Sequence, residues 1–186
     1  SLSEQIKLKN NLREVVILIN MGIGYYRMKK ADSALYCYSQ SITKLQALKN
    51  TRMMLDLLKI HTGDVYFELK RYDDAMVLFN KAKLSSDTTR HHRNMIHARQ
   101  SIAKVLMAKN QFAAAEKELL DCVELAGAVH LNTYSRDVYE LLYQCAERQG
   151  HSTQAFDYFK KYSHYKDSIE NMGEESRIVS MRMEYE

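Results

Sequence analysis

Apolar residues recur at a spacing of three to four along nearly the whole chain, which is the pattern of helices with one buried face. Short polar connections separate the apolar stretches, and proline is absent from the 186 residues. Because little punctuation interrupts these stretches, the pattern predicts long helices joined by tight turns. The predicted helices span residues 9–29, 32–48, 51–70, 73–84, 88–109, 112–126, 130–149 and 152–165, with a last helix from 166 onward.

The residues at the connections are consistent with these boundaries. Asp32, Asp73 and Ser152 stand where second helices begin, and side chains of this kind accept hydrogen bonds from free backbone N–H groups. Basic residues close several of the preceding helices, where they complement the helix dipole. We therefore expect Asp32, Asp73 and Ser152 to be N-caps.

Four alanines lie 41, 40 and 40 residues apart, each at the same place in a helix-turn-helix pattern: Ala34, Ala75, Ala115 and Ala155. A glycine precedes each of the first two alanines by twelve residues, at Gly22 and Gly63. A tyrosine precedes them by nine, at Tyr25 and Tyr66, and a large residue follows each alanine by four: Tyr38, Phe79, Leu119 and Phe159. A fixed period of this length predicts a stack of helical hairpins.

These positions resemble the tetratricopeptide repeat, which carries a small residue and a tyrosine on its first helix and an alanine and an aromatic on its second. The match is weaker in repeats three and four, where Ala103 and Tyr143 replace the glycine. The resemblance implies an all-α fold, a right-handed α-α superhelix of about four such hairpins followed by a C-terminal helix. It divides the chain into an array over 1–165, with repeats near 9–48, 51–84, 88–126 and 130–165, and a segment over 166–186.

The C-terminal segment permits two interpretations. It could cap the last hairpin, as stacked repeats require, or it could be a signalling helix. Lys166, Asp167, Ser168 and the closing Glu184-Tyr185-Glu186 resemble the end of the repeat arrays in bacterial sensor kinases and transcriptional regulators of the Bacteroidetes type. An apolar seam spaced 3, 4, 3 and 4 also indicates a homodimer through this helix; it contains Ile169, Met172, Ser176, Val179 and Met183.

In arrays of this type the first helix of each hairpin lines a concave groove. The resemblance therefore implies that the groove binds a protein or peptide segment, with an apolar first half and a polar second half. The ligand-binding residues that it implies are Ile19, Ile23, Tyr26, Ile60, Asp64, Phe67, Arg93, His97, Ser101, Lys104, Asp137 and Gln144.

The predicted helix over 88–109 carries a basic stripe formed by Arg90, Arg93, His97, Ser101 and Lys104. This stripe could form a recess for a carboxylate or phosphate. It could equally be a solvated face whose charges pair with acids on neighbouring helices, such as Asp64, Asp137 and Glu140. We expect no metal at His91, His92 and His97, because adjacent histidines on a helix point about 100° apart.

Composition narrows the function further. A net charge of +4 is too small to indicate nucleic acid. No apolar run is long enough to span a membrane. The three cysteines fall among apolar positions, which favours buried thiols and a reducing, cytoplasmic compartment, with a periplasmic sensor domain as the alternative. Neither a catalytic constellation nor a cofactor motif is present.

We therefore expect a non-catalytic binding module, the sensory or scaffold part of a bacterial signalling protein or transcriptional regulator, with an output domain following residue 186. A protein-assembly adaptor without signalling output is the alternative. The sequence does not identify the ligand.

Overall fold

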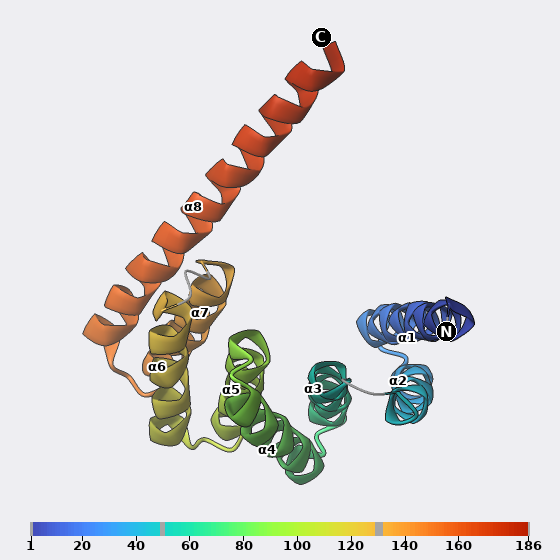
Figure 1. Ribbon diagram of the computed structural model, residues 1–186. Coiled ribbons are helices and arrows are strands. Elements are labelled where there is room, and N and C mark those ends of the chain that lie inside the picture. The colour runs from blue at the N-terminus through green and yellow to red at the C-terminus, as the bar shows by residue number, and fades with distance from the viewer. Residues whose placement is uncertain (1, 49–50, 129–131, 186) are drawn as a thin grey trace. The chain divides into compact units, whose positions relative to one another are not determined.

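The computed structural model describes residues 2–48, 51–128 and 132–185, with side chains described over 9–48, 51–128 and 133–173. Within these residues the chain is all-α and contains eight helices (Figure 1). It divides into two compact units, Ser1–Val105 and Leu106–Glu186, and the boundary between them in the sequence falls within α5. The helices are α1 (Leu2–Arg27), α2 (Ala31–Gln46), α3 (Arg52–Glu68), α4 (Tyr72–Thr89), α5 (His92–Ala108), α6 (Phe112–Ala128), α7 (Asn132–Arg148) and α8 (Ser152–Tyr185).

The first unit contains two complete hairpins, α1 with α2 and α3 with α4. Apolar residues at helical spacing on α1 and α2 face one another, and residues of α3 complete the same core. Burial of these side chains is the main favourable contribution to folding, at about 25 cal/mol per Å² of apolar surface. The buried residues of this core are Val15, Ile19, Ala34, Tyr38, Leu45, Leu58 and Val65.

Gly22 and Gly63 stand at the same position of the first two repeats and let the two helices of each hairpin approach closely. A Cβ atom added to Gly22 would lie 2.4 Å from the Tyr38 ring, and one added to Gly63 would lie 2.4 Å from the Phe79 ring. These distances are too short for any side chain, so each aromatic ring occupies the space that the glycine leaves free. The repeat therefore pairs a missing side chain on the first helix with a large ring on the second.

On α2, α4 and α6, the second helices of the first three hairpins, the alanine of the repeat begins a stripe of buried residues. Ala34, Ala75 and Ala115 are fully buried. The residues four, seven and eleven positions later are buried as well: Tyr38, Ser41 and Leu45 on α2, Phe79, Ala82 and Ser86 on α4, and Leu119, Cys122 and Ala126 on α6.

The last hairpin departs from this pattern. Ala155 is only half-buried and Phe159 is 46 % exposed, because in the described part of the chain no helix follows α8 to cover this side. Tyr143 also replaces the glycine of the earlier repeats, and its ring meets that of Phe159 edge-on with centroids 5.6 Å apart. Three of the four alanines of the repeat, Ala34, Ala75 and Ala115, are therefore fully buried, and Ala155 is not.

The same turn closes the first helix of all four hairpins. The residue five positions before each alanine has a positive φ, at Lys29 (58°), Lys70 (59°), Asn110 (58°) and Gly150 (76°). The next residue then donates its N–H to the carbonyl five residues back, as Lys30 does to Tyr25 at 2.9 Å. This is a Schellman motif, which satisfies carbonyls at the helix end.

The predicted N-caps Asp32 and Asp73 are wrong, since the N-caps of α2 and α4 are Lys30 and Arg71. Neither of these residues makes a side-chain capping bond. The turn brings the helix start forward, so Asp32 and Asp73 lie in the first turn, where their charge still favours the helix dipole. Ser152 is likewise the first residue inside α8 and not the residue before it, so it is not the N-cap either.

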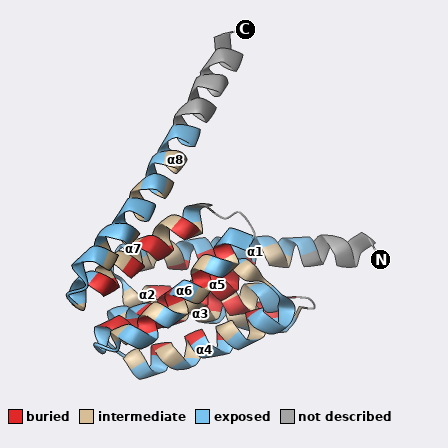
Figure 2. Cartoon of the chain, turned by 90° about the vertical axis from the view of Figure 1, so that its left-hand side faces the viewer, coloured by how far each residue is buried: buried red, intermediate tan, exposed pale blue. Residues whose placement is uncertain are grey.

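The C-terminal part is one helix rather than two. We predicted a break near residue 165, but α8 runs unbroken over Ser152–Tyr185 (Figure 1). Its residues pack on α7 through ring contacts of Tyr158, Tyr162 and Tyr165, and Figure 2 shows the buried residues of α7 where it meets α8. These tyrosines precede Ile169 and Met172 at the same 3–4 spacing. The side chains of Ser176, Val179 and Met183, like residue 186, lie outside the described residues.

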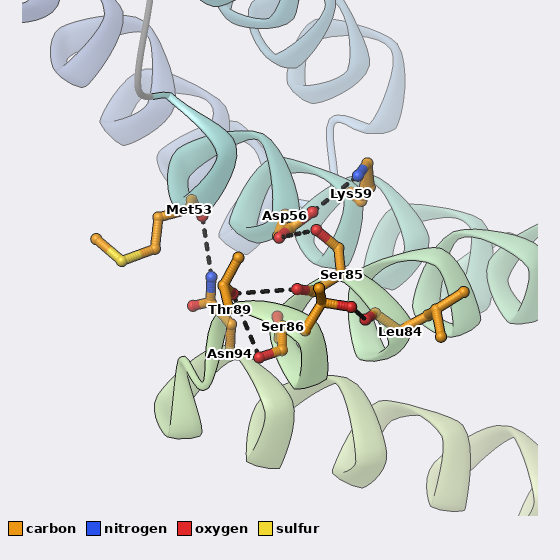
Figure 3. Close-up of polar contacts among 9 residues, drawn as sticks. Met53, Asp56, Lys59, Leu84, Ser85, Ser86, Thr89 and Asn94 are labelled. Carbon is orange, nitrogen blue, oxygen red and sulfur yellow. Dashed lines mark hydrogen bonds and ion pairs between the residues drawn. The ribbon is translucent and has the colours of Figure 1, made fainter.

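A buried carboxylate ties α3 to α4. Asp56 is 1 % exposed and accepts a hydrogen bond from Ser85 Oγ at 2.6 Å and an ion pair from Lys59 Nζ at 2.8 Å (Figure 3). Beside it, Asn94 of α5 donates to the carbonyl of Met53 at 2.9 Å. Asp56 occupies the position of Val15 in the preceding repeat, so periodicity predicts an apolar residue there.

The close crossing can be tested with two substitutions on one helix. Gly22→Ala forces a Cβ against the Tyr38 ring, and we expect it to destabilise the protein by about 1–3 kcal/mol. Gly24→Ala is the matched control, because nothing lies within 4 Å of an added Cβ there. Alanine favours the helix at that position, so the control should gain up to about 1 kcal/mol. Urea denaturation measures both, and equal effects would contradict the packing described here.

The turn geometry predicts a stabilising substitution. Lys70 is exposed and its positive φ strains a residue with a Cβ, so Lys70→Gly should raise the free energy of unfolding by about 1 kcal/mol. Lys70→Ala removes the same charge but keeps the Cβ and should bring no such gain. A thermal melt distinguishes the two variants, and a gain shared by both would assign the effect to charge.

Candidate functional site

Polar side chains from α3 and α5 converge on Asp64 within the first unit. Ser101 Oγ donates to Asp64 Oδ1 at 3.2 Å. His61 Nδ1 and His97 Nε2 each lie 3.9 Å from Asp64 Oδ2, one from the same helix and one from α5. We call these four residues the Asp64 cluster. The Asp64 side chain is 22 % exposed and that of His97 is 33 % exposed, so a ligand at the surface can reach both.

Aromatic rings extend the cluster toward α1 and α2. The His61 ring meets the His97 ring edge-on at 5.9 Å and stacks on Tyr38 at 5.8 Å. Tyr26 of α1 is hydrogen-bonded to Glu68 of α3. Side chains of α3 and α5 thus meet at Asp64, and α1 contributes Tyr26 beside Glu68 of α3.

The electrostatics of this surface keep its tyrosines neutral. Burial raises the pKa of Tyr26 to about 12, with further contributions from the carboxylates of Asp64 and Glu68. Burial, followed by the charge of Asp64, also raises the pKa of Tyr38. Both phenols are protonated at physiological pH, and that of Tyr26 donates its hydrogen bond to Glu68.

The structure places the predicted groove residues in several environments. Ile60 is fully buried and Ile19 is 7 % exposed, so these two lie in the interior. Ile23, Tyr26 and Phe67 are half-buried, with the Phe67 ring packed against Tyr72 of α4 at 5.5 Å.

The polar members of the predicted set differ as well. His97 and Ser101 contact Asp64, whereas Arg93 and Lys104 are exposed. Asp137 and Gln144 are half-buried in the second unit, and Arg136 Nε donates to Asp137 at 2.8 Å. The Asp64 cluster therefore brings together three of the twelve residues and adds His61.

The predicted stripe is wrong at Arg90, which lies at the C-cap of α4 and outside α5. The rest of the basic stripe lies on α5 and is paired in part with an acid of a neighbouring helix. Its central residues, His97 and Ser101, both lie against Asp64 of α3. This contact matches the alternative in which the stripe pairs with neighbouring acids. Arg93 and Lys104 flank the cluster as exposed cations on the same helix.

A recess of about 790 Å³, separate from the Asp64 cluster, is lined by residues of α3 and α4. Its rim carries Arg52, Lys59 and Lys81. Lys59 forms an ion pair with the buried Asp56. Arg52 and Lys81 are exposed to solvent. Spacing of the apolar residues did not reveal this recess, because its cations come from two helices.

Cys37, Cys122 and Cys145 are buried free thiols, and burial raises the pKa of Cys145. Across the described ranges, no group of three histidine, cysteine or acidic residues is placed to hold a metal ion. No described helix is both long enough and apolar enough to cross a membrane.

Known proteins with the same architecture are distant in sequence. No family model matches the chain, and the comparison with curated proteins also finds no match. The structure is similar to aspartyl phosphate phosphatase F from Bacillus subtilis, with a TM-score of 0.80 and 17 % identity over 86 % of this chain and 42 % of that one. It is also similar to the Rap conjugation gene regulator of the plasmid pLS20 in complex with the Phr* peptide (TM-score 0.71, 17 % identity, 83 % of this chain and 43 % of that one).

A third similar structure is that of MamA, with a TM-score of 0.57 and 15 % identity over 90 % of this chain and 86 % of that one. The chain spans less than half the length of the phosphatase and of the plasmid regulator. At these identities the similarity shows the fold alone. The chain is an all-α helical-repeat protein with the tetratricopeptide type of fold, as the sequence predicted.

The raised pKa of Tyr26 predicts how stability depends on alkaline pH. Above the ordinary pKa of 10.0 the unfolded chain loses the phenolic proton, whereas folded Tyr26 keeps it until about 12. Its contribution to stability is therefore complete below pH 10 and lost as pH rises through 12. Tyr26→Phe should flatten the fall in stability over this interval, measured by urea denaturation at several pH values. The control Tyr36→Phe, at a 65 % exposed position, should not.

Proposed function

We propose that the protein is a non-catalytic module that binds a peptide or protein segment along the first helices of its hairpins. The observation that carries the proposal is the convergence of side chains from α3 and α5 on the partly exposed Asp64. Histidine and serine side chains around one carboxylate can both donate and accept hydrogen bonds, which suits a peptide backbone and its polar side chains.

The apolar and aromatic residues beside the cluster supply the other half of a peptide site. Ile23, Tyr26 and Phe67 each keep part of their surface open to solvent. A peptide with an apolar side chain next to a polar or charged one would contact both kinds of surface. Arrays of helical hairpins bind ligands in this manner, through an extended surface instead of a deep cleft.

Two similar structures support a peptide as the ligand. The Rap conjugation gene regulator is described in complex with the Phr* peptide, and a Rap protein in complex with competence and sporulation factor. We extend the proposal to the role: a sensory or scaffold part of a bacterial signalling protein or transcriptional regulator. An assembly adaptor without signalling output is the second candidate.

The proposal is tested by selecting peptides from a random library on the immobilised 186-residue chain and measuring affinities by titration calorimetry. Asp64→Asn removes the charge that organises the cluster, and we expect it to weaken binding about tenfold or more, since hydrogen bonds to charged groups contribute about 1.5–3 kcal/mol. The matched control is Asp87→Asn, an exposed carboxylate on α4 away from the cluster.

A second pair of variants tests the flanking cations. The double variant Arg93→Glu, Lys104→Glu should lower the affinity for peptides that carry a carboxylate and leave the affinity for neutral peptides unchanged. Equal affinity of the Asp64 and Asp87 variants for every selected peptide would place the binding surface elsewhere and overturn the proposal.

A further inference from the structure

The outward side of α8 corresponds, residue by residue, to a surface that is covered inside the array. On α2 the stripe Ala34, Tyr38 and Leu45 belongs to a core that α3 completes with Leu58 and Val65. The corresponding stripe on α8 is Ala155, Phe159 and Lys166, and Phe156 beside it is 61 % exposed. The repeat itself shows what such a surface accepts, namely a first helix lying as α3 lies on α2.

A pocket of about 380 Å³ marks this surface at the turn between α7 and α8. Its lining combines three aromatic rings with one exposed carboxylate, that of Glu147: Tyr143, Glu147, Ser152, Ala155, Phe156 and Phe159. Aromatic faces and a carboxylate together favour a cationic group.

The inner junction shows how charge is matched where α3 meets the first hairpin. Glu68 of α3 receives Lys29 Nζ at 2.7 Å and a hydrogen bond from Tyr26. At the corresponding positions of the last hairpin, Glu147 replaces Tyr26 and Gly150 replaces Lys29. The polarity is therefore reversed, and a helix seated on α8 needs a cation where α3 has Glu68.

The first helix of this chain has that cation. The residue of α1 that corresponds to Glu68 is Arg27, which is exposed. Ile17 of α1 corresponds to the buried Leu58 but is 58 % exposed; Met21 on the same helix is 46 % exposed, and Met28 in the turn that follows is 57 % exposed. The outward side of α1 therefore offers apolar surface with a positive charge at the matching place.

A second position is complementary in the same alignment. Leu45 and Leu55 belong to one core at the inner junction. Lys166 takes the place of Leu45 on α8, and Glu14 takes the place of Leu55 on α1. Glu14 lies 3.0 Å from Lys44 with a side chain 56 % exposed, and Lys166 is 49 % exposed, so both charges can reach a partner.

We propose that α8 of one copy accepts α1 of a second copy, so that the array continues across the junction between chains. In this contact Arg27 faces Glu147, Glu14 faces Lys166, and Ile17 lies toward Phe159. Because the two surfaces differ, the contact is heterologous and joins copies head to tail. The proposal concerns surfaces outside the Asp64 cluster and does not depend on the proposed function.

Sedimentation velocity of the 186-residue chain over a wide concentration range tests the proposal. The wild-type chain should form larger species as concentration rises. Glu147→Lys and Arg27→Glu should each weaken association about tenfold or more through like-charge repulsion, and combining them in one chain should restore it. Lys117→Glu, an exposed charge reversal on α6, is the control and should change nothing. Thermal melts of each variant confirm that it is folded.

Mixing the two single variants gives the sharpest outcome. Each has one mutated and one unchanged surface, so the mixture should associate although neither variant associates alone. A chain that stays monomeric at all concentrations would overturn the proposal. So would association that ignores both charge reversals but is lost in Met172→Asp, because that result would assign the contact to the seam of α8.

Discussion

The close crossing of the two helices in each of the first two hairpins is the contact on which the first unit depends. Gly22 and Gly63 have no side chain, and the rings of Tyr38 and Phe79 fill the space beside them. This contact fixes how far apart the two helices lie and thereby which faces remain for the next hairpin. The buried stripes on α2 and α4 include these rings, and each begins at a buried alanine, as the stripe on α6 also does.

The fold could be read from the sequence because this contact recurs with a nearly constant period. The six helices α2 to α7 begin and end within five residues of the predicted positions, whereas α1 begins earlier, at Leu2, and α8 continues to Tyr185. The break near residue 165 was wrong, since no residue at Tyr165 or Lys166 forces a helix to stop. The predicted N-caps Asp32 and Asp73 were wrong because α2 and α4 begin earlier in the sequence than expected, directly after the turns at Lys29 and Lys70. The positive φ of these two residues shapes the turns, and only the backbone geometry reveals it.

The site was less predictable than the fold. Periodicity places Asp64, His97 and Ser101 on first helices, but it does not tell which acid meets which base. That pairing depends on the offset between α3 and α5. Asp56 was missed because it stands at a core position, and its partners Ser85 and Lys59 are recognisable only once α3 and α4 are packed. Ile19 and Ile60 show the opposite error, since apolar residues on a binding helix can equally lie in the interior.

Because α8 is unbroken, a long stretch of helix follows the ring contact between Tyr165 and α7. Twenty residues follow Tyr165 within the helix to Tyr185, which at a rise of about 1.5 Å per residue amounts to roughly 30 Å. An α-helix of this length bends little, so a tilt of about 10° where it packs on α7 displaces its far end by about 5 Å. A small shift in the tyrosine contacts between α7 and α8 therefore produces a larger displacement at the far end of α8.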